Sequence, residues 1–88
     1  MVPDELDMGT APYARSQIHG GLIQRPQRLT IDLSDVRFMG SAGLGLLVEA
    51  REDAEHTGVK LSLAGVQDNR IVRRALEVSG LYELFDIA

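Results

Sequence analysis

The stretch DLSDVRFMGSAGLG, residues 32–45, decides the fold. Apolar residues alternate with polar ones up to its start, as in a strand, and they recur at helical spacing from its end onward. Upstream, residues 28–33 alternate apolar and polar side chains and include branched residues, which predicts a short strand with one buried face. Downstream, residues 41–57 repeat apolar residues at helical spacing, and Gly58 suits a left-handed C-terminal cap. The buried stripe of this helix is expected to consist of Leu44, Leu47 and Val48, widened by Leu46 and Ala50. The stretch therefore predicts a strand, a loop over 34–40 and the start of a helix.

Working outward, the same patterns predict two more helices and further strands. Toward the N-terminus, Thr10 and Pro12 suit the first turn of a helix over 11–23. Its buried residues are expected to be Ala14, Ile18, Leu22 and Ile23, and residues 5–7 look like a short strand. Toward the C-terminus, residues 59–64 alternate like a second full strand, and Asp68 or Asn69 can cap a helix that ends near Val78. The inward residues of this helix are expected to be Ile71, Val72, Ala75 and Leu76, and a turn over 81–84 and a strand over 85–87 follow.

Strands and helices alternate along the whole chain. This order predicts an α/β fold with a mainly parallel sheet, joined by right-handed crossovers and flanked by helices. With 88 residues the chain has room for one domain, 1–88. A domain of this size buries only about 60–65% of the surface that its unfolded chain exposes, so its stability is expected to be marginal without a partner.

Composition excludes several classes of function. The chain has no cysteine, so disulfides, thiolate metal sites and cysteine nucleophiles are ruled out, and a cytoplasmic location is favoured. The formal net charge of −4 argues against nucleic acid as a partner, and the basic cluster over 70–74 is expected to solvate a helix face. No apolar run approaches the roughly 20 residues that span a bilayer, so membrane insertion is not expected.

Four segments of the chain resemble those of one protein family, in order and at plausible spacing. The loop over 38–44 resembles the F-[ML]-D-S-[ST]-G-L loop of the STAS family, which contains sulfate-transporter domains and anti-sigma-factor antagonists. The other three segments are residues 5–11, 58–63 and 76–85. The resemblance implies a single STAS-like domain, a protein-binding module in a partner-switching network, and a kinase-like anti-sigma factor as partner. It implies neither an enzyme nor a cofactor.

In antagonists of this family, the second hydroxyl residue of the loop is phosphorylated by the anti-sigma factor. Phosphate there would lie at a helix N-terminus and add charge to the face that docks the partner. Here that position is Ala42, which cannot accept phosphate, and Gly40 replaces the usual Asp. The implied partner-binding residues are Phe38, Met39, Gly40, Ser41, Ala42, Gly43 and Leu44. The resemblance thus predicts a docking surface without the standard phosphorylation switch.

Ser41 is the nearest remaining hydroxyl, and two interpretations stay open for it. It is expected to be the helix N-cap, with a hydrogen bond from the backbone N–H of Gly43 or Leu44. The alternative is a substitute phosphoacceptor. Phe38 is expected in the core, whereas Met39 is either buried or part of the docking surface.

Other candidate groups receive structural interpretations. Gly43 and Gly45 match no complete phosphate-binding loop, so close packing of the helix start is the expected reason for glycine, with nucleotide binding as the alternative. His19 and His56 are expected near helix C-termini, and no metal site is expected. Asp35 is expected to bond the loop backbone, rather than to pair with Asp32. Residues Glu49, Glu52, Asp53 and Glu55 are expected to form a solvated helix face, with a partner interface as the alternative.

Relative to the family, the chain is expected to lack the first strand and the last helix. An unpaired sheet edge and a bare sheet face would follow, so a homodimer or a domain-swapped oligomer is expected to cover them, or else a fragile monomer is expected. The function that competes with an antagonist is a cytoplasmic STAS subunit of a transporter or signalling assembly.

Overall fold

The computed structural model describes residues 5–88, except for the side chain of Leu6. The helices are α1 (Ala11–Ile23), α2 (Ser41–Thr57) and α3 (Arg70–Val78), with a 3-10 turn at Tyr82–Leu84. The strands are β1 (Glu5–Leu6), β2 (Arg28–Asp32), β3 (Phe38–Met39), β4 (Lys60–Ala64) and β5 (Asp86–Ile87). The α/β fold with three helices predicted from the sequence is confirmed, and the bounds predicted for α1 and α2 are those observed.

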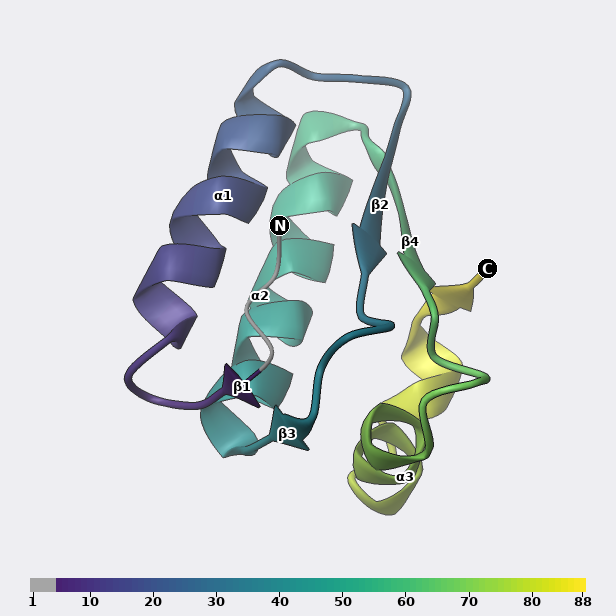
Figure 1. Ribbon diagram of the computed structural model, residues 1–88. Coiled ribbons are helices and arrows are strands. Elements are labelled where there is room, and N and C mark those ends of the chain that lie inside the picture. Colours follow the sequence, from purple (N-terminus) through teal and green to yellow (C-terminus); the bar gives the residue numbers. More distant parts are fainter. Residues whose placement is uncertain (1–4) are drawn as a thin grey trace.

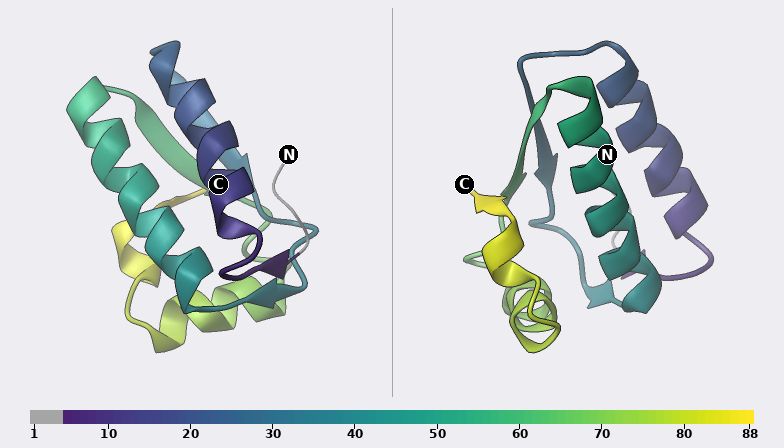
Figure 2. Two further views of the ribbon diagram at one scale, coloured as in Figure 1. Left: turned by 90° about the vertical axis from the view of Figure 1, so that its left-hand side faces the viewer. Right: turned by 180° about the vertical axis from the view of Figure 1, so that it is seen from behind.

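All strand pairs described are parallel. A three-stranded sheet has the order β2-β4-β5, and a separate two-stranded ladder joins β1 to β3. Helices α1 and α2 lie side by side against one face of the larger sheet, whereas α3 lies apart from them, near β3 and the C-terminal end of the chain (Figures 1 and 2). The N-terminal ends of α2 and α3 therefore lie in the same half of the molecule as the β1–β3 ladder.

The core lies between the sheet and the α1–α2 pair and continues under α3. Its fully buried large side chains are Leu22, Leu33, Leu47, Leu63, Val66, Val72 and Leu76. In α2 the buried stripe consists of Gly43, Leu46, Leu47, Ala50 and Ala54. Leu44 and Val48, which were expected in the centre of the stripe, are only half-buried. The stripe is rotated from the prediction because α2 packs against α1 as well as the sheet.

Two other predicted core residues are exposed. Ile23 is 63% exposed at the C-terminal end of α1, and Ile71 is 49% exposed on α3. Helical spacing could not predict this exposure. It shows which face of a helix is apolar, but not how much of that face another element covers.

The second face of the larger sheet is polar. Arg28, Thr30 and Asp32 of β2 are exposed there, and the Thr30 and Ser62 hydroxyls lie 3.0 Å apart in a hydrogen bond across the β2–β4 ladder. Side chains of this kind can face water without loss of apolar burial. This face therefore does not by itself require a covering helix.

Candidate partner-binding surface

The loop that the sequence singled out lies at the N-terminus of α2, where β1, β3 and α3 come together (Figure 1). Ser41 is exposed, Gly40, Ala42 and Leu44 are half-buried, and only Gly43 is buried. The loop therefore presents a surface to solvent. That surface carries no acidic or basic side chain over residues 38–44.

Phe38 is exposed, against the expectation from the sequence, and Met39, for which two positions were left open, is buried. Phe38 is 49% exposed, whereas Met39 is 9% exposed and belongs to the core. The reason is a strand that the sequence did not reveal: β3 pairs with β1, Glu5 opposite Phe38 and Leu6 opposite Met39. Because successive side chains of a strand point to opposite faces, burial of Met39 exposes Phe38. The prediction that Phe38 is a core residue was wrong, because about half of its side chain faces solvent beside the loop.

Ser41 is not the N-cap of α2. The helix begins at Ser41 itself, and the N-cap is Gly40, with extended backbone (φ −92°, ψ −178°) and no side-chain cap. Among the described residues, the Ser41 hydroxyl has no hydrogen-bond partner, and the side chain is exposed. The prediction was wrong by one residue, because Gly40 already has the extended conformation that a cap requires. The Ser41 hydroxyl is therefore not engaged in capping.

Asn69 positions the loop that leads to this surface. Its Oδ1 accepts a hydrogen bond from the backbone N–H of Val72 (3.3 Å), which caps α3 as predicted. Its Nδ2 also donates to the carbonyls of Leu33 (2.9 Å) and Val36 (2.7 Å), a role that the sequence did not reveal. One side chain thus joins the start of α3 to the loop between β2 and β3.

Asp32, and not Asp35, supports the loop backbone. The Asp32 Oδ1 accepts a hydrogen bond from the backbone N–H of Ser34 at 3.0 Å. This bond, together with the Ser34 hydroxyl, holds the pKa of the Asp32 carboxyl below its ordinary value. The turn forms around Asp32 because this residue is the last one of β2. Its carboxylate can therefore accept a hydrogen bond from the backbone N–H of the residue two positions later, Ser34.

Grooves flank the exposed loop on both sides. The α1-side groove, of about 380 Å³, lies between the starts of α1 and α2. It is lined by Met8, Ala11, Pro12, Arg15, Ala42, Gly45, Leu46 and Glu49. Met8 is 85% exposed here. The sequence analysis did not include Met8 in the surface. The one feature that could have indicated it is its position, as an apolar residue between a short strand and a helix.

The α3-side groove, of about 470 Å³, lies between the start of α2 and the length of α3. It is lined by Met39, Leu44, Ile71, Arg74, Ala75, Val78 and Ser79. Ile71 and Val78 are 49% and 77% exposed, so α3 presents an apolar strip beside the loop. Sequence analysis placed Ile71 in the core and therefore missed this part of the surface.

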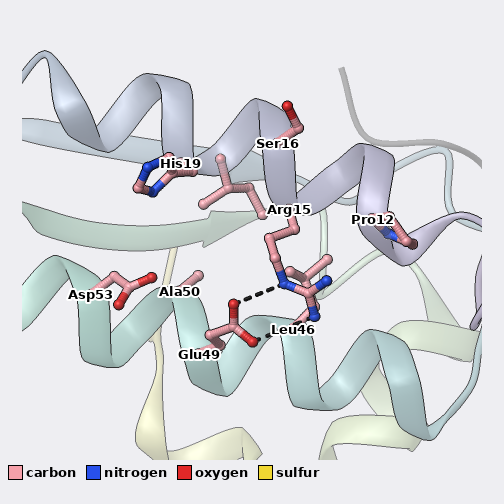
Figure 3. Close-up of a pocket in the computed structure, with 9 residues that line it drawn as sticks. Pro12, Arg15, Ser16, His19, Leu46, Glu49, Ala50 and Asp53 are labelled. Carbon is pink, nitrogen blue, oxygen red and sulfur yellow. Dashed lines mark hydrogen bonds and ion pairs between the residues drawn. The ribbon is translucent and has the colours of Figure 1, made fainter.

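A third depression lies farther along the α1–α2 contact (Figure 3). Arg15 of α1 reaches Glu49 of α2 across it, with distances of 2.8 Å and 3.4 Å from Nε and Nη2 to the two carboxylate oxygens (Figure 3). Glu49 therefore ties the two helices together and is not simply solvated, as the sequence suggested. Of the other acids, Glu55 pairs with Arg51 at 3.3 Å, and Glu52 and Asp53 are exposed.

Gly45 does not have the packing role expected from the sequence. It is exposed in the second turn of α2, and a Cβ added there would meet no heavy atom within 4 Å. Gly43, in contrast, is buried. The close packing inferred for both glycines is therefore wrong for Gly45, which leaves bare helix backbone at the α1-side groove.

The histidines take no part in this surface. His56 is in the last turn of α2, as expected, with Nδ1 2.8 Å from the Glu52 carbonyl. His19 is exposed within α1 and lines the third depression, rather than ending the helix. Over residues 5–88, His, Asp and Glu side chains form no group of three that could hold a metal ion.

Comparison with known proteins identifies the family. The STAS domain model matches residues 1–88, which is the whole chain. The chain belongs to the STAS family. This STAS domain is 31% identical over 86 residues to the anti-sigma-B factor antagonist of Listeria monocytogenes, an alignment that covers 98% of the chain and 74% of the relative. It is 30% identical over 87 residues to the Bacillus subtilis protein of the same name, covering 99% and 77%.

A third relative of the STAS domain is the anti-sigma-F factor antagonist RsfB of Mycobacterium tuberculosis, 32% identical over 81 residues, with 92% of the chain and 64% of the relative covered. These names are those of transcriptional regulators and not of enzymes, in agreement with the expectation from the sequence. None of the helices within residues 5–88 has the length and apolar character needed to cross a membrane.

Proposed function

We propose that this STAS domain is an anti-sigma factor antagonist that binds a kinase-like anti-sigma factor through the N-terminus of α2. The observation that carries the proposal is the surface itself, an exposed and uncharged loop at a helix N-terminus with a mainly apolar groove on each side. Its family and its relatives support the choice of partner. The role places the protein in the cytoplasm, where sigma factors act.

Ala42 makes the proposed antagonist independent of the usual phosphorylation switch. Its methyl group is half-buried at the second residue of α2 and lines the α1-side groove. A phosphate at that position would add a charge of roughly −1.5 to −2 to an uncharged docking face. Since alanine carries no acceptor oxygen, the protein is constitutively competent to bind.

Ser41 is the alternative acceptor. Its exposed hydroxyl makes no hydrogen bond among the described residues, so a kinase could reach it without breaking a cap. Incubation with the anti-sigma kinase and ATP, followed by mass spectrometry, separates the two versions. Phosphate on Ser41 would restore a switch one residue from the usual place, and an unmodified chain supports constitutive binding.

Binding is tested with variants that change only the proposed surface. A42E is expected to weaken binding of the anti-sigma factor at least tenfold, because it adds a bulky carboxylate to a groove in which Arg15 is already paired with Glu49. I23E is the matched control, since Ile23 is exposed at the opposite end of α1. A42S is expected to bind and to become a substrate of the kinase.

Gly45 offers a variant that separates stability from binding. G45A is expected to stabilise the chain by about 0.5–1 kcal/mol, since alanine is the better helix former and its Cβ meets nothing within 4 Å. The same methyl group is expected to weaken partner binding if the partner approaches the bare backbone at the α1-side groove. Recovery of a transporter subunit instead of an anti-sigma factor from the host would contradict the proposal.

The homodimer expected from the sequence is retained as a proposal. It is separable from anti-sigma binding, because the edge of the sheet that it would use is not part of the surface described above.

A further inference from the structure

Helix α3 gathers arginines in a chain that is acidic overall. The formal net charge is −4, yet residues 67–79 hold three arginines against two acids. Arg73 pairs with Glu77 at 3.4 Å. The guanidinium groups of Arg70 and Arg74 are exposed and make no ion pair or hydrogen bond within the part of the chain that the structure describes. These two side chains lie one helical turn apart, and we call them the arginine ridge.

The stability of α3 does not explain this ridge. Arg70 is the first residue of the helix, where the positive end of the helix dipole makes a cation unfavourable. The first turn contains no acidic residue, and the cap is the neutral side chain of Asn69. Asp68 precedes this cap, but it forms no ion pair with Arg70 among the described residues. A charge that opposes its own helix indicates a role outside that helix.

The arginine ridge borders the α3-side groove, whose volume is about 470 Å³. Arg74 itself lines the groove, three residues after Ile71 and four residues before Val78. These two apolar side chains are 49% and 77% exposed and lie two helical turns apart, about 10 Å along the axis. Apolar contact area and positive charge therefore lie side by side on one face of α3, next to the start of α2.

A second copy of this chain does not fit this surface. Two antiparallel α3 helices, related by a two-fold axis at the centre of the strip, would bring both copies of Arg74 together, and like charges repel. An anionic membrane is also disfavoured, because the chain has a net negative charge and the arginine ridge lies beside the loop that is proposed to dock a protein. The surface is therefore complementary to an acidic protein segment.

An acidic amphipathic helix has the required chemistry. Such a helix presents apolar residues two turns apart on one face and can carry Asp or Glu beside them. Its apolar side chains would cover Ile71 and Val78, and its carboxylates would reach the arginine ridge. We propose that α3 binds an acidic amphipathic helix of the anti-sigma factor through this groove and this ridge, an inference that rests on the proposed function and adds the chemistry of the partner's segment.

Charge and apolar contact are tested one at a time. R74E is expected to weaken binding of the anti-sigma factor at least about tenfold, because it places a carboxylate against those of the partner. R74Q removes only the attraction, so a smaller loss is expected, and its dissociation constant should depend less on salt than that of the wild-type chain. V78S is expected to weaken binding about fivefold, since the burial of a valine side chain is lost. Both side chains are exposed in the free chain, so the midpoints of urea unfolding are expected to stay unchanged.

The controls make the same changes elsewhere. R28E reverses an exposed charge on β2, and I23S removes an exposed apolar side chain at the end of α1, both outside the α3-side groove. Both variants are expected to bind like the wild-type chain. Isothermal titration calorimetry at low and at high salt measures each dissociation constant.

R74K adds a readout of the partner's chemistry. Its amine keeps the positive charge, and a carbodiimide couples an amine to a carboxylate that lies in contact with it. Mass spectrometry of the coupled complex then identifies the partner residue. A link to an Asp or Glu within a helix of the anti-sigma factor is expected, and a complex without a link from this position refutes the contact.

The inference is overturned, while the proposed function stands, if R74E, R74Q and V78S all bind like the wild-type chain and A42E does not. A wild-type chain that binds no anti-sigma factor overturns both. Vesicles of phosphatidylglycerol and phosphatidylcholine in equal parts test the membrane. If they bind the wild-type chain but not R74E, and binding of the anti-sigma factor ignores R74E, the arginine ridge belongs to a membrane contact and the acidic protein segment is refuted.

Discussion

Asn69 is the side chain whose removal should reveal most about how the proposed docking surface is held in place. Its Oδ1 caps α3, and its Nδ2 reaches the carbonyls of Leu33 and Val36 in the loop before β3. Loss of the cap in N69A costs about 1 kcal/mol. Loss of the two bonds to carbonyls in a partly buried setting costs about 1 kcal/mol each. The free energy of unfolding is therefore expected to fall by about 3 kcal/mol.

N69D keeps the cap and reverses the loop contacts. Aspartate keeps an oxygen that can cap α3, but it replaces the donor by a second carboxylate oxygen that faces the carbonyls of Leu33 and Val36, so these contacts become repulsive. We expect N69D to lose at least about 2 kcal/mol although its cap is intact, against about 3 kcal/mol for N69A. D68N is the control at the adjacent exposed position, with an expected change within about 0.5 kcal/mol.

Urea unfolding followed by far-UV circular dichroism measures these differences, provided that the m-values stay unchanged. Amide hydrogen exchange adds a local readout, since residues 33–37 should exchange faster in both variants than in the wild-type chain. If N69A and N69D each lose less than about 1 kcal/mol, the loop is held by something other than Asn69.

Three further outcomes follow from the structure. G65A should lose about 3 kcal/mol or fail to fold, because Gly65 has φ +75° and a Cβ would lie 2.6–2.7 Å from Ser34 backbone and Cβ atoms; a loss below about 1 kcal/mol in thermal unfolding would contradict this. A double-mutant cycle of R15A and E49A should give a coupling of about 0.5 kcal/mol that salt reduces, since both side chains are 47% exposed. NMR titration should give the Asp32 carboxyl a pKa below its ordinary value. Because the folded-state pKa is lowered, the stability that the carboxylate contributes is present above the unfolded-state pKa and is lost as the pH falls through the folded-state pKa; a midpoint at or above the ordinary value would refute the Ser34 contact.

The sequence determined the elements whose causes are local. The bounds of α1 follow from apolar spacing and from Thr10 and Pro12 at its start, and those of α2 follow from apolar spacing between two glycines. Gly58 has the left-handed backbone expected for a C-terminal cap (φ +74°). The alternation over residues 28–33 predicted which side of β2 is buried, and the motif over 38–44 predicted the family. These features depend on residues within a few positions of one another, so a pattern in the chain is enough to reveal them.

The tertiary structure decided which apolar residues remain uncovered and which polar side chains connect distant segments. Phe38 is exposed and Met39 buried because β3 pairs with β1, more than thirty positions away. Ile71 is exposed because the segments packed against α3 do not cover its whole apolar face, and Asn69 holds a loop from another part of the chain. Burial of a residue depends on which distant segments pack beside it, and the spacing of apolar residues within one segment does not predict those contacts.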